Sequence, residues 1–321
     1  MKFHAPHFWF TQHSSLATLL LPLSFLYNQA GKLLRAQVTP QKMSVPVICV
    51  GNILVGGSGK TPLVRTLAKT LQQLGFLPHI ISRGYGGYLR GPLRVDPAIH
   101  TLGEVGDEPL LLSAIAPVWV AKDKVAGAKA AIAAGATHII LDDGLQNPSL
   151  HKDIIFLVID ATRGLGNGHV LPAGPLRETL DDALAKTSAV IWIGNGDNEL
   201  KKSLNAKKKL IEANAKTFCT THDLSGQKLF AFCGLGNAQK FYDGVRELGA
   251  NIIKTADFPD HYVWSAFEIE MLLNEAKTLS ALPVTTAKDA MRIPQSLGDQ
   301  IAICDVAITL DEIALQKLIT P

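Results

Sequence analysis

The sequence predicts an α/β fold with a doubly wound, mostly parallel sheet and a smaller α/β lobe toward the C-terminus. Short apolar and β-branched runs alternate with amphipathic stretches from residue 45 onward. This alternation is typical of parallel strands joined by crossover helices. A polar, lysine-rich stretch at residues 195–216 interrupts the pattern, which then resumes. We therefore expect an N-terminal helical segment over 1–40, a core over 41–215 and a smaller C-terminal lobe over 216–321.

The individual elements follow from the apolar spacing. In the core, strands are predicted at 45–50, 77–82, 118–121, 138–141, 154–159 and 189–193, and helices at 62–74, 109–115 and 124–134. Residues 195–216 are interpreted as a solvated helix or a linker. In the smaller lobe, strands are predicted at 228–233, 251–255, 284–286 and 302–305, and helices at 238–248 and 266–279.

The composition fits a folded protein with a large core. Apolar residues make up 47% of the 321 residues, charged residues make up 18%, and the net charge is only +3. So small a charge argues against a nucleic-acid-binding protein that relies on a basic surface. The four cysteines lie far apart, in or beside apolar runs, and form no CxxC pair. We interpret Cys49, Cys219, Cys233 and Cys304 as core residues of a protein in a reducing compartment, rather than as metal ligands or disulfides.

The N-terminal segment carries no Asp, Glu, Lys or Arg from Phe3 to Gly31, and residues 16–27 are mostly apolar. A helix that crosses a bilayer needs about 20 apolar residues, whereas Pro22 and the polar residues 12–15 interrupt this one. A signal peptide and a helix packed on the protein's own core are alternatives. We favour an interfacial helix or hairpin that dips its apolar side chains into lipid, with Lys32 and Arg35 meeting anionic headgroups.

A glycine-rich loop joins the first predicted strand to the first predicted helix. Residues 51–62 read GNILVGGSGKTP and contain the Gly-Lys-Thr core of a Walker A loop. Glycines let backbone N–H groups approach phosphate oxygens, and the helix N-terminus adds partial positive charge. A lysine here can reach the β- and γ-phosphates, and the next hydroxyl can ligate Mg²⁺. The expected nucleotide contacts are Leu54, Val55, Gly56, Gly57, Ser58, Gly59, Lys60 and Thr61.

This loop makes the expected fold similar to that of P-loop NTPases, with one departure. Leu54 stands where the consensus G-x₄-G-K-[ST] has its first glycine, and the paired Gly56 and Gly57 supply the flexibility instead. The competing interpretation is a glycine-rich turn with a surface lysine.

Two carboxylates, Asp142 and Asp143, follow the apolar strand predicted at 138–141. A strand end that carries Asp beside a phosphate loop is where Mg²⁺ or its water shell is held. Successive strand residues point to opposite faces, so both can bind the metal directly only if the strand has ended. An ordinary Asp-Asp-Gly turn is the alternative.

Asp107 and His261 are the candidate acid–base residues. Asp107 lies in the segment GDEP before a predicted helix, so it is either an N-cap or a base that accepts a proton from a substrate hydroxyl. His261 lies in the segment FPDHY. A histidine in such a loop is more often a surface residue than a catalyst.

Several segments, taken together and in order, resemble the tetraacyldisaccharide 4′-kinases of lipid A synthesis. The resemblance covers nearly the whole chain and rests on VGNILVGGSGKTP at 50–62, SRGYGG at 82–87, GDEP at 106–109, LDDGLQ at 141–146, DATRGLGNG at 160–168, LPAGPLRE at 171–178, FCGLGN at 232–237, FPDHY at 258–262 and TTAKD at 285–289. No single segment is diagnostic, but the set is highly specific.

The resemblance implies a two-lobed kinase on the cytoplasmic face of the inner membrane, with an N-terminal membrane-associating helix. It implies ATP, Mg²⁺ and a lipid-linked glucosamine disaccharide 1-phosphate as ligands, and no nucleic acid. It assigns Asp107 as the catalytic base, His261 as its support, and Asp142 and Asp143 to the metal. Further site segments contain Arg83, Gln146, Arg177 and Glu178, which are candidates for contacts with the substrate.

The chain departs from the family pattern at two places. Asn147 stands where the family usually has His, so a titrating role at that position is in doubt. Lys122 and Lys124 stand where the family tends to have Arg, which preserves charge but loses the bidentate guanidinium.

Two other functions remain open from the sequence. One is a P-loop kinase for a soluble small molecule, which would act without lipid. The other is a membrane-associated ATPase switch. Such switches usually carry an extra lysine just before the paired glycines, where this chain has Val55.

Overall fold

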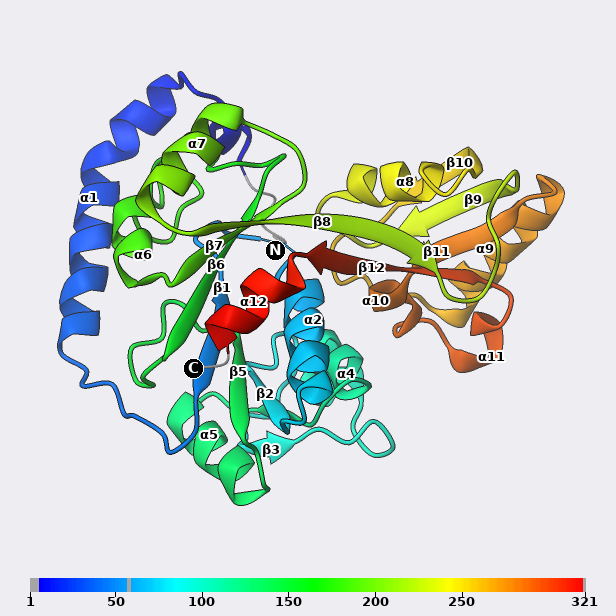
Figure 1. Cartoon of the computed structure of the whole chain (residues 1–321). Coiled ribbons are helices and arrows are strands. Elements are labelled where there is room, and N and C mark those ends of the chain that lie inside the picture. Colours follow the sequence, from blue (N-terminus) through cyan, green and yellow to red (C-terminus); the bar gives the residue numbers. More distant parts are fainter. Residues whose placement is uncertain (1–5, 57–58, 320–321) are drawn as a thin grey trace.

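The computed structural model describes residues 6–56 and 59–319. Over these residues, twelve strands form one sheet in the order β10-β9-β11-β12-β8-β7-β6-β1-β5-β2-β4-β3 (Figure 1). Neighbouring strands run parallel except in the pairs β12–β8 and β3–β4. The predicted α/β class with a mostly parallel sheet is therefore confirmed. Gly57 and Ser58, two of the expected nucleotide contacts, lie outside the described residues.

The bounds of the elements are as follows. The strands are β1 (Val47–Gly51), β2 (Pro78–Ser82), β3 (Leu93–Arg94), β4 (Val118–Val120), β5 (His138–Asp142), β6 (Ile154–Asp160), β7 (Ala189–Ile193), β8 (Leu210–Cys219), β9 (Lys228–Cys233), β10 (Asn251–Asp257), β11 (Leu282–Thr286) and β12 (Ala302–Leu310). The helices are η1 (His7–Phe10), α1 (Ser15–Ala36), α2 (Lys60–Gln73), α3 (Leu102–Val105), α4 (Asp107–Ser113), α5 (Lys124–Ala133), α6 (Leu180–Lys186), α7 (Asn198–Lys207), α8 (Ala238–Arg246), α9 (Ala266–Thr278), α10 (Ala287–Ala290), α11 (Gln295–Gly298) and α12 (Glu312–Ile319).

Helices cover both faces of the sheet because its strands are apolar on both sides. In the first lobe, built on β1–β7 and the start of β8, side chains of α2, α4 and α12 pack on one face. Side chains of α5, α6 and α7 pack on the other. In the second lobe, built on β9–β11 and the far ends of β8 and β12, α8 covers one face and α9 the other.

The two lobes are joined by β8 and β12, which run side by side between them (Figure 1). The solvated helix or linker expected at 195–216 is only partly right, since α7 is followed by the long strand β8. The sequence did not predict this strand because its exposed positions carry polar residues. Buried and exposed positions alternate in β8 where it lies against β12. A division at 215/216 would cut β8 and would separate α12 from the core cluster of the first lobe that it joins.

Helix α1 lies along the outside of the first lobe, beside α6 and α7, and continues through Pro22 (Figure 1). Its inward face is small and polar: Ser24 donates to the Val170 carbonyl at 2.7 Å, and Lys32 pairs with Asp182 at 2.8 Å. Its outward face is apolar, with large exposed side chains at Leu16, Leu19, Leu21, Leu23, Phe25, Leu26, Tyr27, Leu33 and Leu34. This distribution is the reverse of that of a helix packed on a protein core. Among the residues that the structure describes, no helix is long and apolar enough to cross a membrane.

Candidate active site

The glycine-rich loop leads from the buried end of β1 to the first residue of α2. Gly59, which precedes α2, has a left-handed φ of 77°, and Gly56 has a φ of 102°. These conformations favour glycine. The Lys60 ammonium donates to the Asn52 side-chain oxygen at 3.0 Å, and the Asn52 amide donates to the Leu54 carbonyl at 2.9 Å. Asn52 therefore links the Lys60 side chain at the start of α2 to the first residues of the loop.

Leu54 occupies the consensus glycine position for a reason that the structure makes plain. Its side chain is buried in the core between the sheet and α5–α7, and its backbone bridges to Leu176. Val55 N–H donates to the Pro175 carbonyl at 3.0 Å. This part of the loop is thus anchored to the segment at 171–178.

The acidic pair lies at the end of β5, which is the strand next to β1, with Asp142 in register with Val50. The strand ends at Asp142, and Asp143 takes a left-handed φ of 56°, so the strict alternation of side chains stops there. The Lys60 ammonium lies 3.6 Å from Asp143. Burial, and then the charge of Glu108, raises the pKa of Asp142 to about 7, although Lys60 acts in the opposite direction. A buried carboxylate of this kind is one that a bound cation would stabilise.

Three residues of the matched segments brace this acidic pair. Arg177 pairs with Asp143 at 3.1 Å and donates to the Gln146 side-chain oxygen at 3.3 Å. The Gln146 amide donates to the Asn52 carbonyl and to the buried Glu178, each at 3.0 Å. Glu178 is only 1% exposed and pairs with Lys186 at 2.8 Å. Gln146 and Glu178 therefore sit behind the loop as supports, whereas Arg177 faces the carboxylates.

Lys124, at the start of α5, is a further candidate site residue, for which the sequence gave only a weak signal. Its side chain is buried, and the ammonium has no hydrogen-bond partner among the described residues. Burial lowers its pKa to about 8, and the charge of Asp142 opposes that shift. The exposed Arg83 also acts on it. An orphaned cation beside the acidic pair fits an anionic ligand that is not a protein group.

Asn147 and Lys122 are the other two departures from the family pattern. Both form hydrogen bonds with residues other than those of the candidate site. The Asn147 side-chain oxygen accepts from Ser149 N–H at 3.0 Å and from its hydroxyl at 2.8 Å. Lys122 is exposed, and its N–H donates to the Arg90 carbonyl at 2.9 Å.

Asp107 opens α4 in the first lobe, but its charged partners come from the second lobe. It is 6% exposed, lies 3.1 Å from His261 Nδ1, and forms an ion pair with Arg292. The Lys288 ammonium lies 3.9 Å from the same carboxylate oxygen. Burial, and then the charge of Lys288, lowers the pKa of His261. The predicted pairing of Asp107 with His261 is therefore present, and two further cations accompany it.

Arg292 is itself fixed by a buried network that the sequence did not reveal. Asp289 is fully buried, pairs with Arg292 at 3.0 Å, and accepts from Gly234 N–H at 3.0 Å. The Thr286 hydroxyl at the end of β11 also donates to Asp289, at 2.8 Å. The segment TTAKD thus serves to aim Arg292 and Lys288 at Asp107. The only sequence signal was its place among the matched segments.

Glu108 connects the two halves of the site. It follows Asp107 in α4, and its charge acts on both Asp142 and His261. A second contact between the lobes lies at the end of β6, where Asp160 pairs with Lys240 of α8 at 2.8 Å. Burial raises the pKa of Asp160, but the hydrogen bond and charge of Lys240 outweigh it and lower that pKa overall.

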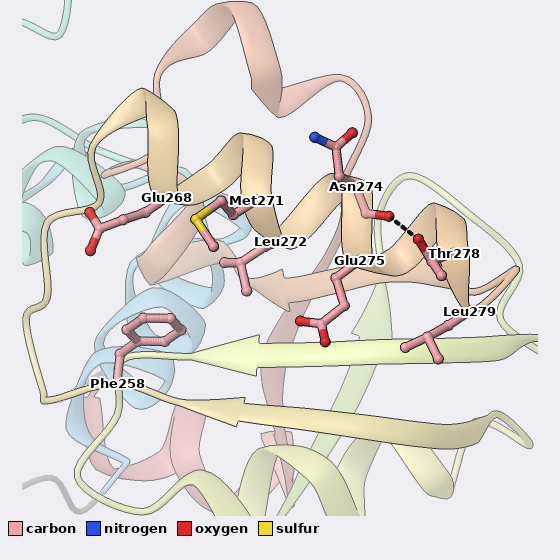
Figure 2. A pocket seen from close by; sticks show the side chains of 8 residues that line it. All are labelled: Phe258, Glu268, Met271, Leu272, Asn274, Glu275, Thr278 and Leu279. Atoms are coloured by element: carbon pink, nitrogen blue, oxygen red, sulfur yellow. Dashed lines mark hydrogen bonds between the residues drawn. The ribbon is translucent and has the colours of Figure 1, made fainter.

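A separate hollow lies on the second lobe, along α9 (Figure 2). The described side chains that line it are Phe258, Glu268, Met271, Leu272, Asn274, Glu275, Thr278 and Leu279. They come from α9 and its C-terminal end, and from the residue after β10, so this hollow lies along α9 and is lined by none of the candidate site residues described above.

A glycine-rich loop, a lysine and paired carboxylates at the ends of adjacent parallel strands are typical of enzymes that transfer phosphoryl groups from nucleotides. A family model described as tetraacyldisaccharide-1-P 4′-kinase matches residues 16–320. The chain belongs to this family, as the sequence resemblance indicated.

Individual relatives agree with this assignment. The chain is 43% identical to the tetraacyldisaccharide 4′-kinase of Rhodospirillum centenum, covering 99% of this chain and 96% of that protein. It is 44% identical to the enzyme of the same name from Parvibaculum lavamentivorans, covering 97% and 91%. Among solved structures, it resembles LpxK from Aquifex aeolicus in complex with ATP, with a TM-score of 0.74 and 27% identity over 95% of this chain and 98% of that chain.

Proposed function

We propose that this protein transfers the γ-phosphoryl group of ATP to the 4′-hydroxyl of tetraacyldisaccharide 1-phosphate, a step of lipid A synthesis. Family membership supports the reaction and the substrate. The observation that carries the proposal is a pair of neighbouring groups: Lys60 with the carboxylate of Asp143, and the buried Asp107 of the first lobe with His261 of the second. The charge of Glu108, next to Asp107, acts on both Asp142 and His261.

The first lobe supplies a nucleotide site of the P-loop type. Lys60 and the loop N–H groups would hold the β- and γ-phosphates, and the orphaned ammonium of Lys124 is available for a further phosphate oxygen. Thr61, Asp142 and Asp143 would hold Mg²⁺, which when bound neutralises charge on the transferring phosphoryl group. Residues 6–56 and 59–319 contain no cluster of three His, Cys, Asp or Glu side chains able to hold a metal by themselves. One or two carboxylates with substrate phosphates are, however, the usual Mg²⁺ arrangement.

Asp107 is proposed as the base that takes the proton of the attacking hydroxyl. Its side chain is buried and held by His261 and Arg292, so its orientation is fixed before the substrate arrives. Positioning and charge neutralisation carry most of a phosphoryl transfer, and the base adds roughly 10²–10⁴-fold. Arg177, which pairs with Asp143, and the exposed Arg83, whose charge acts on Lys124, are proposed to contact an anionic substrate.

Helix α1 is proposed to lie on the cytoplasmic face of the inner membrane, where its lipid substrate is found. Its leucines point away from the protein, with Leu19 75% exposed and Leu33 65% exposed. Arg35 lies in the last turn of the helix, and Lys32 lies one turn earlier and is paired with Asp182. An apolar stripe of this size on a helix with basic neighbours is typical of an interfacial helix on an anionic bilayer. No nucleic acid is expected as a partner.

The membrane part can be tested by sedimentation with vesicles that contain phosphatidylglycerol. Replacing three outward leucines by glutamine should release the protein from vesicles without lowering its thermal stability, because these side chains are exposed: Leu19→Gln, Leu26→Gln and Leu33→Gln. The matched control replaces exposed apolar residues elsewhere: Leu77→Gln, Ile99→Gln and Ile313→Gln. Equal vesicle binding by the two triple variants would contradict the proposal.

The reaction itself is tested by phosphate transfer from γ-labelled ATP to the disaccharide 1-phosphate in detergent micelles. Wild-type protein should form labelled lipid, and Asp107→Ala should form little. A protein that phosphorylates only soluble acceptors, or that hydrolyses ATP without any lipid, would instead be the soluble kinase or the ATPase switch that the sequence left open.

A further inference from the structure

Two cysteines face each other on the strands that join the lobes. Cys219, the last residue of β8, is directly opposite Cys304 of β12 in the antiparallel register. The adjacent pair is hydrogen-bonded, since Thr220 N–H donates to the Ile303 carbonyl at 3.0 Å. Hydrogen-bonded and non-hydrogen-bonded pairs alternate, so Cys219 and Cys304 form a non-hydrogen-bonded pair. In such pairs the Cα atoms lie about 4.5 Å apart with the side chains on one face, and disulfides span Cα separations of about 4.4–6.8 Å.

Both thiols are free, and Cys219 packs against the core cluster of the second lobe that contains Cys304. Cys304 is buried, whereas Cys219 is half-buried and open to small reagents. Of the expectation that all four cysteines are buried core residues, Cys49, Cys233 and Cys304 fit and Cys219 does not.

We propose that Cys219 and Cys304 are a redox-sensitive pair, which forms a reversible disulfide across β8 and β12 and thereby slows turnover. The disulfide rests on geometry alone. The effect on turnover rests on the proposed kinase function.

The two thiols are suited to different parts of the reaction. Burial raises the pKa of Cys219, but hydrogen bonds from Thr221 and from the backbone of His222 outweigh it and lower that pKa overall. Burial and the neighbouring Cys219 charge raise the pKa of Cys304 to about 12. Cys219 is therefore the nucleophile toward an oxidant and Cys304 the resolving thiol. Once Cys219 is oxidised to a sulfenic acid, it carries no thiolate charge, so it no longer opposes ionisation of the Cys304 thiol.

The chemistry balances with a peroxide as the two-electron oxidant. The Cys219 thiolate attacks one peroxide oxygen, the O–O bond breaks, and the departing hydroxide leaves as water while Cys219 becomes a sulfenic acid. The Cys304 sulfur then attacks the Cys219 sulfur, the S–O bond breaks, and the oxygen leaves as a second water with the Cys304 proton. Two thiols and one peroxide thus give one disulfide and two waters. A cytosolic reductant reverses the bond, as in other transient cytosolic disulfides.

The bond would act on the site through the end of β11. Cys304 is in register with Thr286, which holds Asp289, and Asp289 fixes Arg292 against Asp107. β8 and β12 are also the strands through which the lobes connect (Figure 1). A disulfide between β8 and β12 restricts bending of this strand pair. Because Asp107 belongs to the first lobe and its charged partners to the second, restricted bending limits how the two lobes move relative to each other at the site.

The experiment oxidises the full-length protein with hydrogen peroxide, alkylates the remaining thiols and maps them by mass spectrometry. The expected result is loss of two hydrogen atoms and a linked pair of tryptic peptides, 217–228 and 293–317, with Cys49 and Cys233 still alkylated. Turnover should fall roughly 2- to 30-fold, the range of coupling between sites, and should recover with dithiothreitol. Cys219→Ser should keep its activity under peroxide. Cys304→Ala, which also lacks one of the two thiols, is a second, independent variant and should keep its activity as well.

Free or over-oxidised thiols at both positions would overturn the proposal, as would a linked pair with unchanged turnover or a peroxide effect that persists in Cys219→Ser. If the reduced protein transfers no phosphate, the kinase function fails, while peptide mapping still decides whether the disulfide forms.

Discussion

The half of the site that is proposed to hold phosphate and the half that is proposed to accept the proton are built in opposite ways. Asp142 and Asp143 lie at the end of β5, and Lys60 begins α2 after the loop that follows the adjacent strand β1, so a single sheet edge brings them together. Asp107 is held by His261, Lys288 and Arg292, which follow it by more than 150 residues and belong to the other lobe. The first half is set by local sequence and strand order. The second exists only while the two lobes are correctly joined, so variants should separate the two halves.

The largest expected effect separates chemistry from nucleotide binding. Asp107→Asn keeps the side-chain shape but removes the base, so kcat should fall roughly 10²–10⁴-fold. The affinity for ATP should stay close to that of the wild type, because the nucleotide groups lie in the other half. Single-turnover kinetics with an independent ATP-binding titration measure the two quantities, and a near-normal kcat would show that Asp107 is not the base.

Lys60→Ala should damage both phosphate positioning and catalysis. Loss of one positioned cation at a developing charge costs roughly 10²–10³-fold in kcat, and here ATP affinity should fall as well. The matched control is Lys69→Ala, an exposed lysine of the same helix α2. If Lys60→Ala kept full ATP affinity, the phosphate role of the loop would be contradicted.

Arg292→Met tests whether the second lobe supports the base. A charge-assisted hydrogen bond contributes about 1.5–3 kcal/mol, so kcat should fall roughly 10- to 100-fold while KM for ATP changes little. Arg292→Lys should restore part of the loss, because it returns the charge without the planar fork. Arg246→Met, at an exposed arginine of α8, is the control. Similar losses in the Arg292 and Arg246 variants would point to a general weakening of the second lobe.

The smallest expected effect concerns protonation of His261. Burial and then Lys288 lower its pKa below the ordinary histidine range, so the folded protein binds this proton less readily than the unfolded chain. The neutral form of His261 therefore stabilises the folded protein at pH values above the pKa that histidine has in the unfolded chain. This contribution to the free energy of unfolding is lost as the pH falls from that pKa to the lower pKa of the folded protein.

Lys288→Met should raise the pKa of His261 and so narrow the pH range over which this stability is lost. NMR titration of the imidazole measures that pKa. Lys277→Met, at an exposed lysine of α9, should leave it in place. An unchanged titration in Lys288→Met would mean that burial alone sets the shift.

The sequence was most informative where function depends on neighbouring residues. The strand, glycine-rich loop and helix around Lys60 could be placed because their apolar runs and glycines are contiguous, and the family resemblance is confirmed by the matching family model. It was least informative at β8, whose alternating polar residues suggested a solvated stretch. The structure shows instead a strand that pairs with β12. It also gave no reason for Leu54 in a glycine position. That reason is its burial against the segment at 171–178.

The N-terminal helix shows the same division. The sequence determined that residues 16–27 are apolar and uncharged, but it left open which side of the helix faces the protein. The fold turns Ser24 and Asn28 inward and the leucines outward.

The sequence by itself determined the α/β class from its alternating apolar runs, and the family from several segments in order along the chain. It also placed the glycine-rich loop and the acidic strand end, because each depends on spacing within a short stretch of chain. Only the tertiary structure decided that Arg292 and Lys288 join His261 at Asp107, that Lys124 is buried without a partner, and that Cys219 faces Cys304. These contacts depend on strand order and on the packing of two lobes, and no local pattern in the chain encodes distances between residues so far apart.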